Sequence, residues 1–259
     1  MTLTSSSQIE ASYPSLKGRV VFVSGGASGI GEAMVRAFHA QGACVGFCDL
    51  DTVAGQTLAN ELAHGHPVRF EPCDVTDVSA FATAIATVSK HFGPIGTLVN
   101  NAANDQRHRI ENVTSAMFDQ TVAVNLKHQF FAAQAVMADM EKLGGGSIIN
   151  LGSTSWMIKG EGYAVYQACK AAVRGLTRAL ARDLGQRNIR VNGIVPGWVM
   201  TEKQLRLWVT PASGTVIDQA QCLPGRLMAH DIAAMALFLA SDDARMCSAQ
   251  DFVVDAGWS

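Results

Sequence analysis

Short β-branched runs alternate with longer helical patterns along almost the whole chain, and this alternation constrains the fold more than any other feature. The runs are apolar on both sides, as in strands buried on both faces, and they lie at residues 19–24, 43–48, 67–72, 95–99, 146–151, 189–195 and 251–254. The helical patterns lie between them, at about 30–41, 52–63, 77–92, 116–142, 163–184 and 229–240. Right-handed crossovers between such elements place helices on both faces of a parallel sheet. The sequence therefore predicts an α/β protein with a single-domain, doubly wound (Rossmann-type), seven-stranded parallel sheet.

Composition excludes several functional classes. Of the 259 residues, 48% are hydrophobic and 16% are charged, which is enough apolar material for a large core. The 20 basic and 22 acidic residues nearly balance, so we expect neither a nucleic-acid partner nor an anionic membrane. The six cysteines form no C-x-x-C pair, which favours buried thiols in a reducing cytoplasm. The polar start of the sequence lacks a secretory signal and no run is long enough to span a membrane, so a cytoplasmic protein is predicted.

No linker or internal repeat divides the chain. We expect residues 1–16 to form a flexible N-terminal arm and residues 17–259 to form a single domain. Residues 200–228 interrupt the alternation with prolines and glycines among short helical patterns. An insertion this late in the sheet is expected to lie over the carboxyl ends of the strands as a substrate lid.

A glycine-rich segment follows the first predicted strand and opens the first predicted helix. It carries Gly25, Gly29 and Gly31 in the spacing G-x-x-x-G-x-G. Glycines let the backbone turn sharply and approach a pyrophosphate, while the free N–H groups of the new helix point at it. This placement within a βαβ unit predicts a nucleotide-binding loop rather than a simple tight turn.

Asp49 ends the second predicted strand, 18 residues after Gly31. A carboxylate at this position accepts hydrogen bonds from ribose hydroxyls and repels a 2′-phosphate. No Arg or Lys stands in the loop or directly after Asp49 to attract such a phosphate. The alternative is a surface aspartate that caps the next helix. We predict NAD rather than NADP as the cofactor.

Tyr166 and Lys170 form a Y-x-x-x-K pair on one face of a predicted helix. An ammonium beside a phenol favours the phenolate, so we expect the pKa of Tyr166 to be lowered toward the working range of a general base. Ser153 lies 13 residues earlier, just past a predicted strand, where its hydroxyl can hold the reacting oxygen in line with the phenol. Tyr163 and Gln167 share the same spacing, but glutamine supplies no charge.

The glycine loop, Asp49, Ser153, Tyr166 and Lys170 follow one another in this order along the chain. With them, the sequence resembles the short-chain dehydrogenase/reductase family from about Leu16 to Trp258. The other segments that carry the resemblance are CDV with Asp74, NNAA at 100–103, VNL with Asn125 and PGWVMT at 196–201. Two positions depart from the family pattern. Ser24 stands where threonine is usual, which keeps the hydroxyl, and Ala103 replaces the usual glycine of NNAG.

The resemblance implies a catalytic tetrad of Asn125, Ser153, Tyr166 and Lys170. In it, Asn125 would hold a water next to Lys170, which would also hold the nicotinamide ribose. Members of the family are commonly homotetramers, so we expect a homo-oligomer with its seam on residues 116–142 and 163–184.

The resemblance also implies a cofactor site. Asp74 and Val75 would border the adenine, Asn101 would help fix the cofactor edge of the central strand, and Val199 and Thr201 would contact the carboxamide. The full expected set is Gly25, Ser28, Gly29, Ile30, Gly31, Asp49, Leu50, Asp74, Val75, Asn101, Ala102, Tyr166, Lys170, Pro196, Gly197, Val199 and Thr201.

Several segments are similar to a narrower group, the bacterial aldose 1-dehydrogenases of the D-xylose type. They are YPSLKGRVV at 13–21, NDQRHRIENVT at 104–114, GSTSW at 152–156, QCLPGR at 221–226 and FLASDDA to DAGW between 238 and 258. The implied reaction is oxidation at C1 of a cyclic aldose, such as D-xylose or L-arabinose, to its aldonolactone, with Tyr166 as the base and NAD as the hydride acceptor.

A sugar site needs several polar groups among a few flat apolar ones. The candidates near Ser153 and Tyr166 are Asn104, Asp105, His108, Ser153, Ser155, Trp156, Tyr166 and Gln167. Trp156 is the first choice for stacking on a sugar face, because its ring follows the catalytic serine closely. No second ligand has metal-like spacing from His108, so no metal site is predicted. Arg107 and Arg109 are interpreted as structural or interface charges.

Two alternatives are weighed against this hypothesis. One is a short-chain enzyme that acts on another secondary alcohol or ketone, such as a 3-hydroxyacyl, steroid or polyol substrate. The polar NDQRH run and Asp49 disfavour it, because such an enzyme would favour an apolar lid and often NADPH. The other is a catalytically silent NAD-binding module, which would lack Ser153, Tyr166 or Lys170; all three are present.

Overall fold

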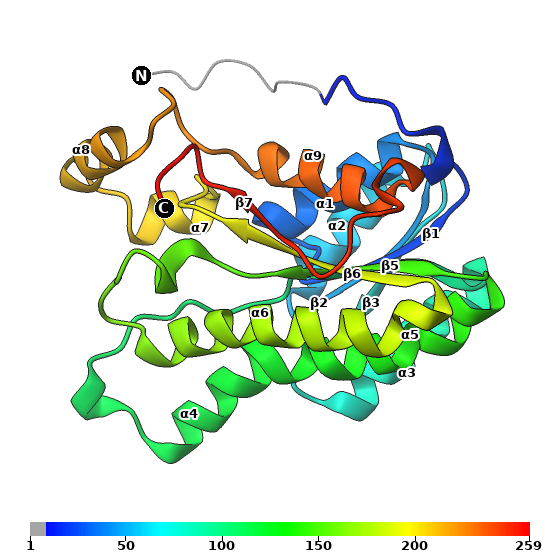
Figure 1. Cartoon of the computed structure of the whole chain (residues 1–259), viewed down its shortest axis with the longest axis horizontal. Coiled ribbons are helices and arrows are strands. Elements are labelled where there is room, and N and C mark those ends of the chain that lie inside the picture. The colour runs from blue at the N-terminus through cyan, green and yellow to red at the C-terminus, as the bar shows by residue number, and fades with distance from the viewer. Residues whose placement is uncertain (1–8) are drawn as a thin grey trace.

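A computed structural model describes residues 9–259, and its core is one seven-stranded sheet (Figure 1). Every neighbouring pair of strands is parallel, and the order across the sheet is β3-β2-β1-β4-β5-β6-β7. The strands are β1 Val20–Ser24, β2 Cys44–Asp49, β3 Val68–Pro72, β4 Ile95–Asn100, β5 Gly146–Leu151, β6 Ile189–Pro196 and β7 Asp251–Val254. The predicted single-domain, doubly wound parallel sheet is confirmed.

Helices cover both faces of this sheet. In Figure 1, α1, α2 and α9 lie on one face, while α3, α5 and α6 lie on the other. The helices are α1 Gly29–Ala40, α2 Thr52–Leu62, α3 Val78–Phe92, α4 Ser115–Val122, α5 His128–Lys142, α6 Ala164–Leu184, α7 Glu202–Leu207, α8 Pro211–Ala220 and α9 Ala229–Ala240. Side chains alternate along β1: Val21 and Val23 pack in the core under α1 and α9, whereas Phe22 packs under α3. Strands that are apolar on both sides therefore connect two separate cores.

The predicted helix over 116–142 is interrupted. A π-helical segment at Ala123–Lys127 separates α4 from α5, and it contains the buried Asn125. One extra residue in a turn shifts every following side chain around the helix axis, and such π segments often lie at functional sites. Hydrophobic periodicity alone did not distinguish this segment from a continuous helix.

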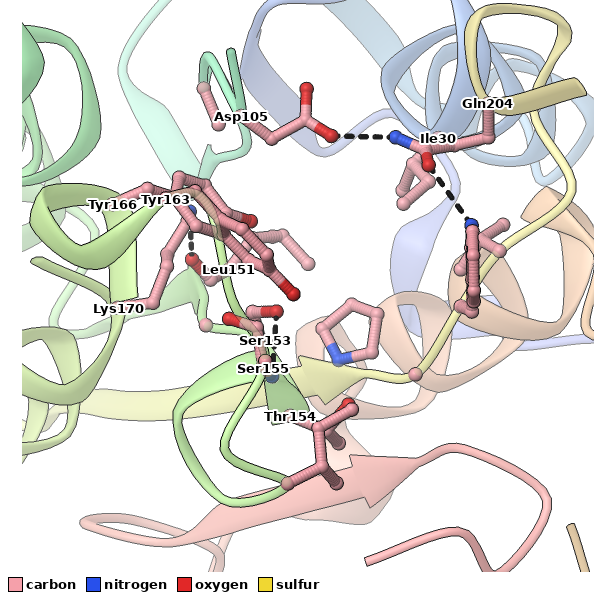
Figure 2. A pocket seen from close by; sticks show the side chains of 18 of the residues that line it. Ile30, Asp105, Leu151, Ser153, Thr154, Ser155, Tyr163, Tyr166, Lys170 and Gln204 are labelled. Carbon is pink, nitrogen blue, oxygen red and sulfur yellow. Dashed lines mark hydrogen bonds between the residues drawn. The ribbon is translucent and has the colours of Figure 1, made fainter. Parts of the chain in front are cut away.

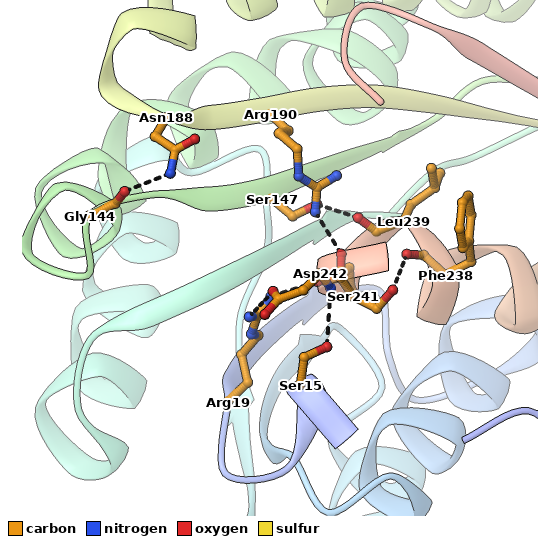
Figure 3. A network of polar contacts seen from close by, with 11 residues as sticks. Ser15, Arg19, Gly144, Ser147, Asn188, Arg190, Phe238, Leu239, Ser241 and Asp242 are labelled. Carbon is orange, nitrogen blue, oxygen red and sulfur yellow. Dashed lines mark hydrogen bonds and ion pairs between the residues drawn. The ribbon is translucent and has the colours of Figure 1, made fainter. Parts of the chain in front are cut away.

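The edge of the sheet at the amino ends of the strands is closed by polar contacts to the end of α9 (Figure 3). Arg19 Nη1 donates to the carbonyl of Ala240 at 2.6 Å, and Arg190 Nη2 donates to the carbonyl of Ser241 at 3.2 Å. Ser147 Oγ donates to the carbonyl of Leu239 at 2.9 Å. The last carbonyls of a helix lack partners within the helix, so these donors stabilise its end.

The expected flexible arm at 1–16 begins outside the described residues, which start at Ile9. The rest of that range contacts the body of the protein. Leu16 is fully buried, the Tyr13 N–H donates to Gln41 Oε1 at 2.8 Å, and Gln41 Nε2 donates to the carbonyl of Ala11 at 2.9 Å. The packed part of the chain therefore starts earlier than residue 17, because Leu16 completes the core beside α1 and α9.

His128 begins α5 and is fully buried. Burial, with the charge of Lys170 nearby, lowers the pKa of His128 to about 3. In the unfolded chain, the pKa of a histidine is about 6.5. Between pH 3 and pH 6.5, the unfolded chain therefore binds a proton at His128 that the folded protein does not bind. This contribution to stability is complete above about pH 6.5 and is lost as the pH falls toward 3.

A His128→Gln variant is expected to be less sensitive to acid than the parent. Urea unfolding of both proteins at pH 7 and at pH 4.5 measures the effect. We expect the difference in unfolding free energy to shift by about 2–3 kcal/mol in favour of the variant at the lower pH. A difference that stays constant between the two pH values would contradict a buried neutral His128.

Candidate active site

Two adjoining cavities lie at the carboxyl ends of the strands, where β1 separates β2 from β4. This is the point at which the strand order reverses, where open α/β sheets bind ligands. The larger, of about 950 Å³, follows the glycine loop and the ends of β2 and β3 and is called here the glycine-loop cleft. The smaller, of about 370 Å³, contains Tyr166 and is called the Tyr166 cavity (Figure 2). Ile30, Asn101, Ala103 and Thr201 line both.

The glycine loop requires its glycines for steric reasons. A Cβ on Gly31 would lie 1.8 Å from the carbonyl oxygen of Gly25, and a Cβ on Gly25 would lie 2.8 Å from Cα of Ala102. Gly25 and Gly29 also have φ values of +66° and +57°, a region that side chains disfavour. Ser28 precedes α1 without a side-chain cap, so the N–H groups at the start of α1 are left for an anionic ligand.

Ser24 and Asn101 hold this loop against β4. Ser24 Oγ accepts the backbone N–H groups of Asn101 and Ala102 at 3.0 and 3.1 Å. Asn101 Nδ2 donates to the carbonyls of Ser24 and Gly25 at 3.1 and 2.8 Å. Serine at position 24 thus keeps the hydroxyl contacts that the loop uses.

Asp49 lies at the end of β2 and lines the glycine-loop cleft. Its Oδ2 accepts the N–H of Ala27 at 3.0 Å and its Oδ1 accepts the N–H of Asp51 at 3.1 Å. The cap of α2 is Asp51, which accepts the N–H of Ala54 at 2.9 Å. Asp49 is therefore not the helix cap, and its carboxylate borders the cleft.

The structure places almost all of the expected cofactor residues on the two cavities. The glycine-loop cleft is lined by Gly25, Ser28, Gly29, Ile30, Gly31, Asp49, Leu50, Val75, Asn101, Ala102 and Thr201. The Tyr166 cavity is lined by Pro196, Gly197, Val199, Tyr166 and Lys170. Asp74 lines neither, and its Oδ1 accepts the N–H of Thr76 at 2.8 Å. The closely approaching glycines, the N–H groups without a side-chain cap at the start of α1 and the carboxylate of Asp49 at the far end fit a dinucleotide.

Ser153, Tyr166 and Lys170 meet in the Tyr166 cavity (Figure 2). Ser153 hydrogen-bonds to Tyr166, and its Oγ accepts the N–H of Ser155 at 3.1 Å. Lys170 is 2% exposed; its Nζ donates to the carbonyl of Leu151 at 2.8 Å and lies 5.6 Å from the centre of the Tyr166 ring. The last strand residue of β5 therefore anchors the lysine beside the phenol.

Electrostatics in this cavity are dominated by burial. Burial raises the pKa of the Tyr166 phenol above its usual value, and the hydrogen bond from Ser153 opposes that rise. Burial also lowers the pKa of Lys170 to about 8. The sequence pattern predicts that Lys170 lowers the pKa of Tyr166; the direction is the opposite, because loss of solvent is the largest effect on the phenol.

Asn125 lies in the π segment and joins the end of α4 to the loop that contains Asn104. Its Nδ2 donates to the carbonyls of Asn104 and Thr121 at 3.1 and 2.9 Å, and its Oδ1 accepts the N–H of Asn104 at 3.0 Å. The side chain is completely buried. Its amide therefore fixes the start of the 104–109 loop, which forms one wall of the Tyr166 cavity.

The expected substrate residues divide into two groups. Asp105, Ser153, Ser155 and Tyr166 line the Tyr166 cavity, whereas Asn104, His108, Trp156 and Gln167 do not. The second group includes residues that shape the neighbouring loops. Gln167 Nε2 donates to the carbonyls of Ser155 and Gly160 at 3.0 and 2.7 Å, and the His108 N–H donates to the carbonyl of Gly162 at 2.7 Å.

Sequence reasoning missed several side chains that line the same cavity, among them Arg107, Tyr163, Trp198, Gln204 and Trp258. Arg107 was interpreted as a structural charge, yet its guanidinium lies 3.7 Å from the centre of the Tyr163 ring. Trp198 could have been found from its position directly after Pro196 and Gly197. Nothing in the local pattern indicated Trp258, which is 60 residues farther along the chain.

The lid region contributes α7 to the site and leaves α8 to one side (Figure 1). Gln204 Nε2 on α7 donates to Asp105 Oδ2 at 2.6 Å, across the cavity from Ser153 in Figure 2. Lys203 Nζ lies 2.6 Å from Asp105 Oδ1. Both contacts lower the pKa of Asp105 against the effect of its burial. Asp105 is therefore a charged link between the 104–109 loop and α7.

All six cysteines are free thiols. Within residues 9–259, no group of three or more His, Cys, Asp or Glu side chains is arranged to hold a metal ion. No helix in this described part of the chain has both the length and the apolar character needed to cross a membrane.

Comparisons with known proteins agree with this architecture. A family model described as enoyl-(acyl carrier protein) reductase matches residues 25–259. A D-xylose 1-dehydrogenase of Caulobacter vibrioides is 44% identical over 250 residues, covering 96% of this chain and 98% of that relative. A probable galactose dehydrogenase of Rhizobium meliloti is 41% identical over 259 residues, covering 99% of each chain. Among solved structures, a blue fluorescent protein from a metagenomic library, in complex with NADPH, has a TM-score of 0.87 and 35% identity, covering 95% of this chain and 99% of that one.

The matched span includes the glycine loop and the Ser153, Tyr166 and Lys170 group, and it extends over nearly the whole described chain. The structural neighbour carries a nicotinamide cofactor, which agrees with the shape of the glycine-loop cleft. The chain belongs to the short-chain dehydrogenase/reductase family and is an oxidoreductase.

Proposed function

We propose that the protein oxidises a cyclic aldose at C1 to the aldonolactone with NAD as the hydride acceptor, a pentose such as D-xylose or L-arabinose being the expected substrate. The observation that carries the proposal is the Ser153, Tyr166 and Lys170 group at the junction of a dinucleotide cleft with a cavity of polar and aromatic walls. Two sugar dehydrogenases that match almost the full chain support the substrate class.

In the proposed reaction, the anomeric hydroxyl of the sugar lies within reach of Ser153 and Tyr166. The O–H bond breaks and its proton goes to Tyr166, while the C1–H bond breaks and C1 becomes the lactone carbonyl. A bound NAD supplies the acceptor for the hydride. Ser153 orients the oxygen, and Lys170 provides positive charge next to the phenolate.

The site residues named from the sequence keep their proposed roles here. Asp49 holds the adenosine ribose, the start of α1 faces the pyrophosphate, and Val199 and Thr201 lie at the nicotinamide end. A homotetramer is part of the same proposal and follows from the family resemblance alone. A cytoplasmic location is also proposed, because six free thiols suit a reducing compartment.

The experiment is a panel of aldoses, polyols and simple secondary alcohols, each followed by NADH formation. We expect the highest kcat/KM on a pentose in its ring form, and the lactone as the first product. Turnover of other alcohols with no turnover of any aldose would overturn the proposal.

The preference for NAD makes a prediction of its own. Arg36 also lines the glycine-loop cleft, but its Nε lies 2.9 Å from Glu32 and its Nη2 lies 2.5 Å from Glu61, so its charge is already paired. Asp49→Ser is expected to shift the ratio of kcat/KM for NAD over NADP by at least about tenfold toward NADP, since the repelling carboxylate is gone. Asp51→Asn is the matched control, because asparagine keeps the cap of α2. A parent enzyme that prefers NADP would contradict the assignment.

The raised pKa of Tyr166 also predicts a pH profile. The phenol must release its proton before it can act as a base, so we expect kcat for oxidation to rise between pH 6 and 8. Above about pH 8, Lys170 loses its own proton and the rise should become shallower. A flat profile across this range, measured on the best aldose of the panel, would contradict Tyr166 as the base.

A further inference from the structure

The segment 255–259, which follows β7, is folded into a tight turn against the Tyr166 cavity. The carboxylate of Asp255 accepts the N–H of Gly257 at 2.8 Å and both the N–H and the hydroxyl of Ser259 at 2.8 and 2.9 Å. Asp255 is itself buried. These contacts satisfy the carboxylate within five residues and fix the direction in which Trp258 points.

Two neighbouring segments hold this turn from the outside. The N–H groups of Cys222 and Leu223 donate to the carbonyl of Ala256 at 2.9 and 3.1 Å. A Cβ on Gly197 would lie 2.7 Å from Cβ of Asp255, and a Cβ on Gly257 would lie 2.9 Å from Cβ of Cys222. The turn is therefore packed closely between the end of β6 and the segment after α8, and Figure 1 places the end of the chain beside α7.

The result is a pair of indole rings in the cavity wall. Trp198 and Trp258 both line the Tyr166 cavity, with ring centres 6.2 Å apart and planes inclined at 41°. Trp198 Nε1 donates to Gln204 Oε1 at 3.0 Å, so the orientation of that ring is also fixed. Trp156, the ring expected from the sequence to stack on a sugar, does not line the cavity.

Resting on the proposed function, we infer that Trp258, together with Trp198, forms the apolar wall against which the ring of a neutral aldopyranose stacks, and that the 255–259 turn exists to present it. Pyranose rings carry an apolar C–H face, and aromatic side chains bind such flat faces at little conformational cost. The polar side chains of Asp105, Ser153 and Ser155 on the other walls would then face the hydroxyls.

The test compares Trp258→Ala and Trp258→Phe with the parent, and Val253→Ala serves as control because it truncates an exposed side chain on the adjacent strand. The measurements are KM and kcat for the best aldose, KM for NAD, the melting temperature, and the inhibition constant of 1,5-anhydroxylitol, a pyranose ring without the reacting hydroxyl. We expect Trp258→Ala to raise the aldose KM and the inhibition constant by about tenfold or more. Trp258→Phe should recover most of this loss, and KM for NAD should stay within about twofold.

Two results would overturn the inference. One is an aldose KM and an inhibition constant within twofold of the parent in Trp258→Ala. The other is an equal rise in KM for NAD, which would indicate a general structural role. Failure of the proposed function is seen separately in the parent protein, as turnover of another alcohol but of no aldose. In that case, a KM for that alcohol that is unchanged in Trp258→Ala would also contradict the role of Trp258 in binding the substrate.

Discussion

A Tyr166→Phe variant is expected to lose about a thousandfold or more in kcat while its NAD affinity stays within a few-fold of the parent. Phenylalanine keeps the buried ring but removes the hydroxyl to which we assign the proton transfer. The hydrogen bond to Ser153 is lost as well, so the reacting oxygen loses part of its alignment. Steady-state rates with the best aldose and cofactor titration by protein fluorescence measure the two quantities.

Tyr163→Phe is the matched control for this variant. The two tyrosine rings lie 5.7 Å apart, and both line the same cavity. The ring of Tyr163 stacks on Arg107, and phenylalanine retains that contact, so we expect a loss of less than about tenfold. If Tyr166→Phe kept a rate within tenfold of the parent, or if both variants lost activity equally, Tyr166 would not be the proton-transferring group.

Burial explains why the electrostatics of this site could not be predicted from residue spacing. The Y-x-x-x-K pattern places a cation near the phenol, which argues for a lowered pKa, but it contains no information on solvent. Tyr166 and Lys170 are both buried. Burial raises the pKa of Tyr166 and lowers the pKa of Lys170, so it favours the neutral form of each side chain. The proximity of the two side chains was predictable, whereas the sign of the pKa shift of Tyr166 depends on its burial.

The fold was predictable because its signals are local. Apolar runs such as those of β1, β4 and β5 are buried on both faces, and each is followed by a helical pattern, so strand number and direction follow from the sequence. The π segment at Ala123–Lys127 was not predictable, because its hydrophobic pattern continues through both helices. The packing of Leu16 was missed because a single leucine in a polar stretch has no period.

The residues that line the Tyr166 cavity also divide into some that the sequence predicted and some that it did not. Residues one or two positions beyond a strand, such as Ser153, were found because the carboxyl end of the strand fixes their location. Trp156 was expected in this wall but does not line the cavity, and Trp258 was missed, because the directions of these side chains are set by a 3₁₀ turn and by the contacts of Asp255. Side chains that reach a site through tertiary contacts leave no spacing signal in the chain.

Gly31→Ala is expected to be the most damaging small substitution in the nucleotide site. The added methyl would lie 1.8 Å from the carbonyl oxygen of Gly25 and 2.6 Å from Nδ2 of Asn101, so the backbone of the loop has to move. That movement breaks the 2.8 Å hydrogen bond between Asn101 and Gly25 and displaces the start of α1. We expect NAD affinity to fall by about a hundredfold or more and the unfolding free energy to fall by about 2 kcal/mol or more.

Gly175→Ala, in the middle of α6, is the control that makes this prediction specific. It adds the same methyl group, but apart from its chain neighbours and the backbone of α6, no atom of residues 9–259 lies within 4 Å of the new Cβ, and the position is exposed. Alanine stabilises a helix interior relative to glycine, so this variant should gain about 0.5–1 kcal/mol and bind NAD as the parent does. Urea unfolding and NAD titration of the two variants, side by side, therefore give opposite signs for stability. A Gly31→Ala protein that binds NAD with the affinity of Gly175→Ala would show that the close approach of Gly31 to Gly25 is not what the cofactor requires.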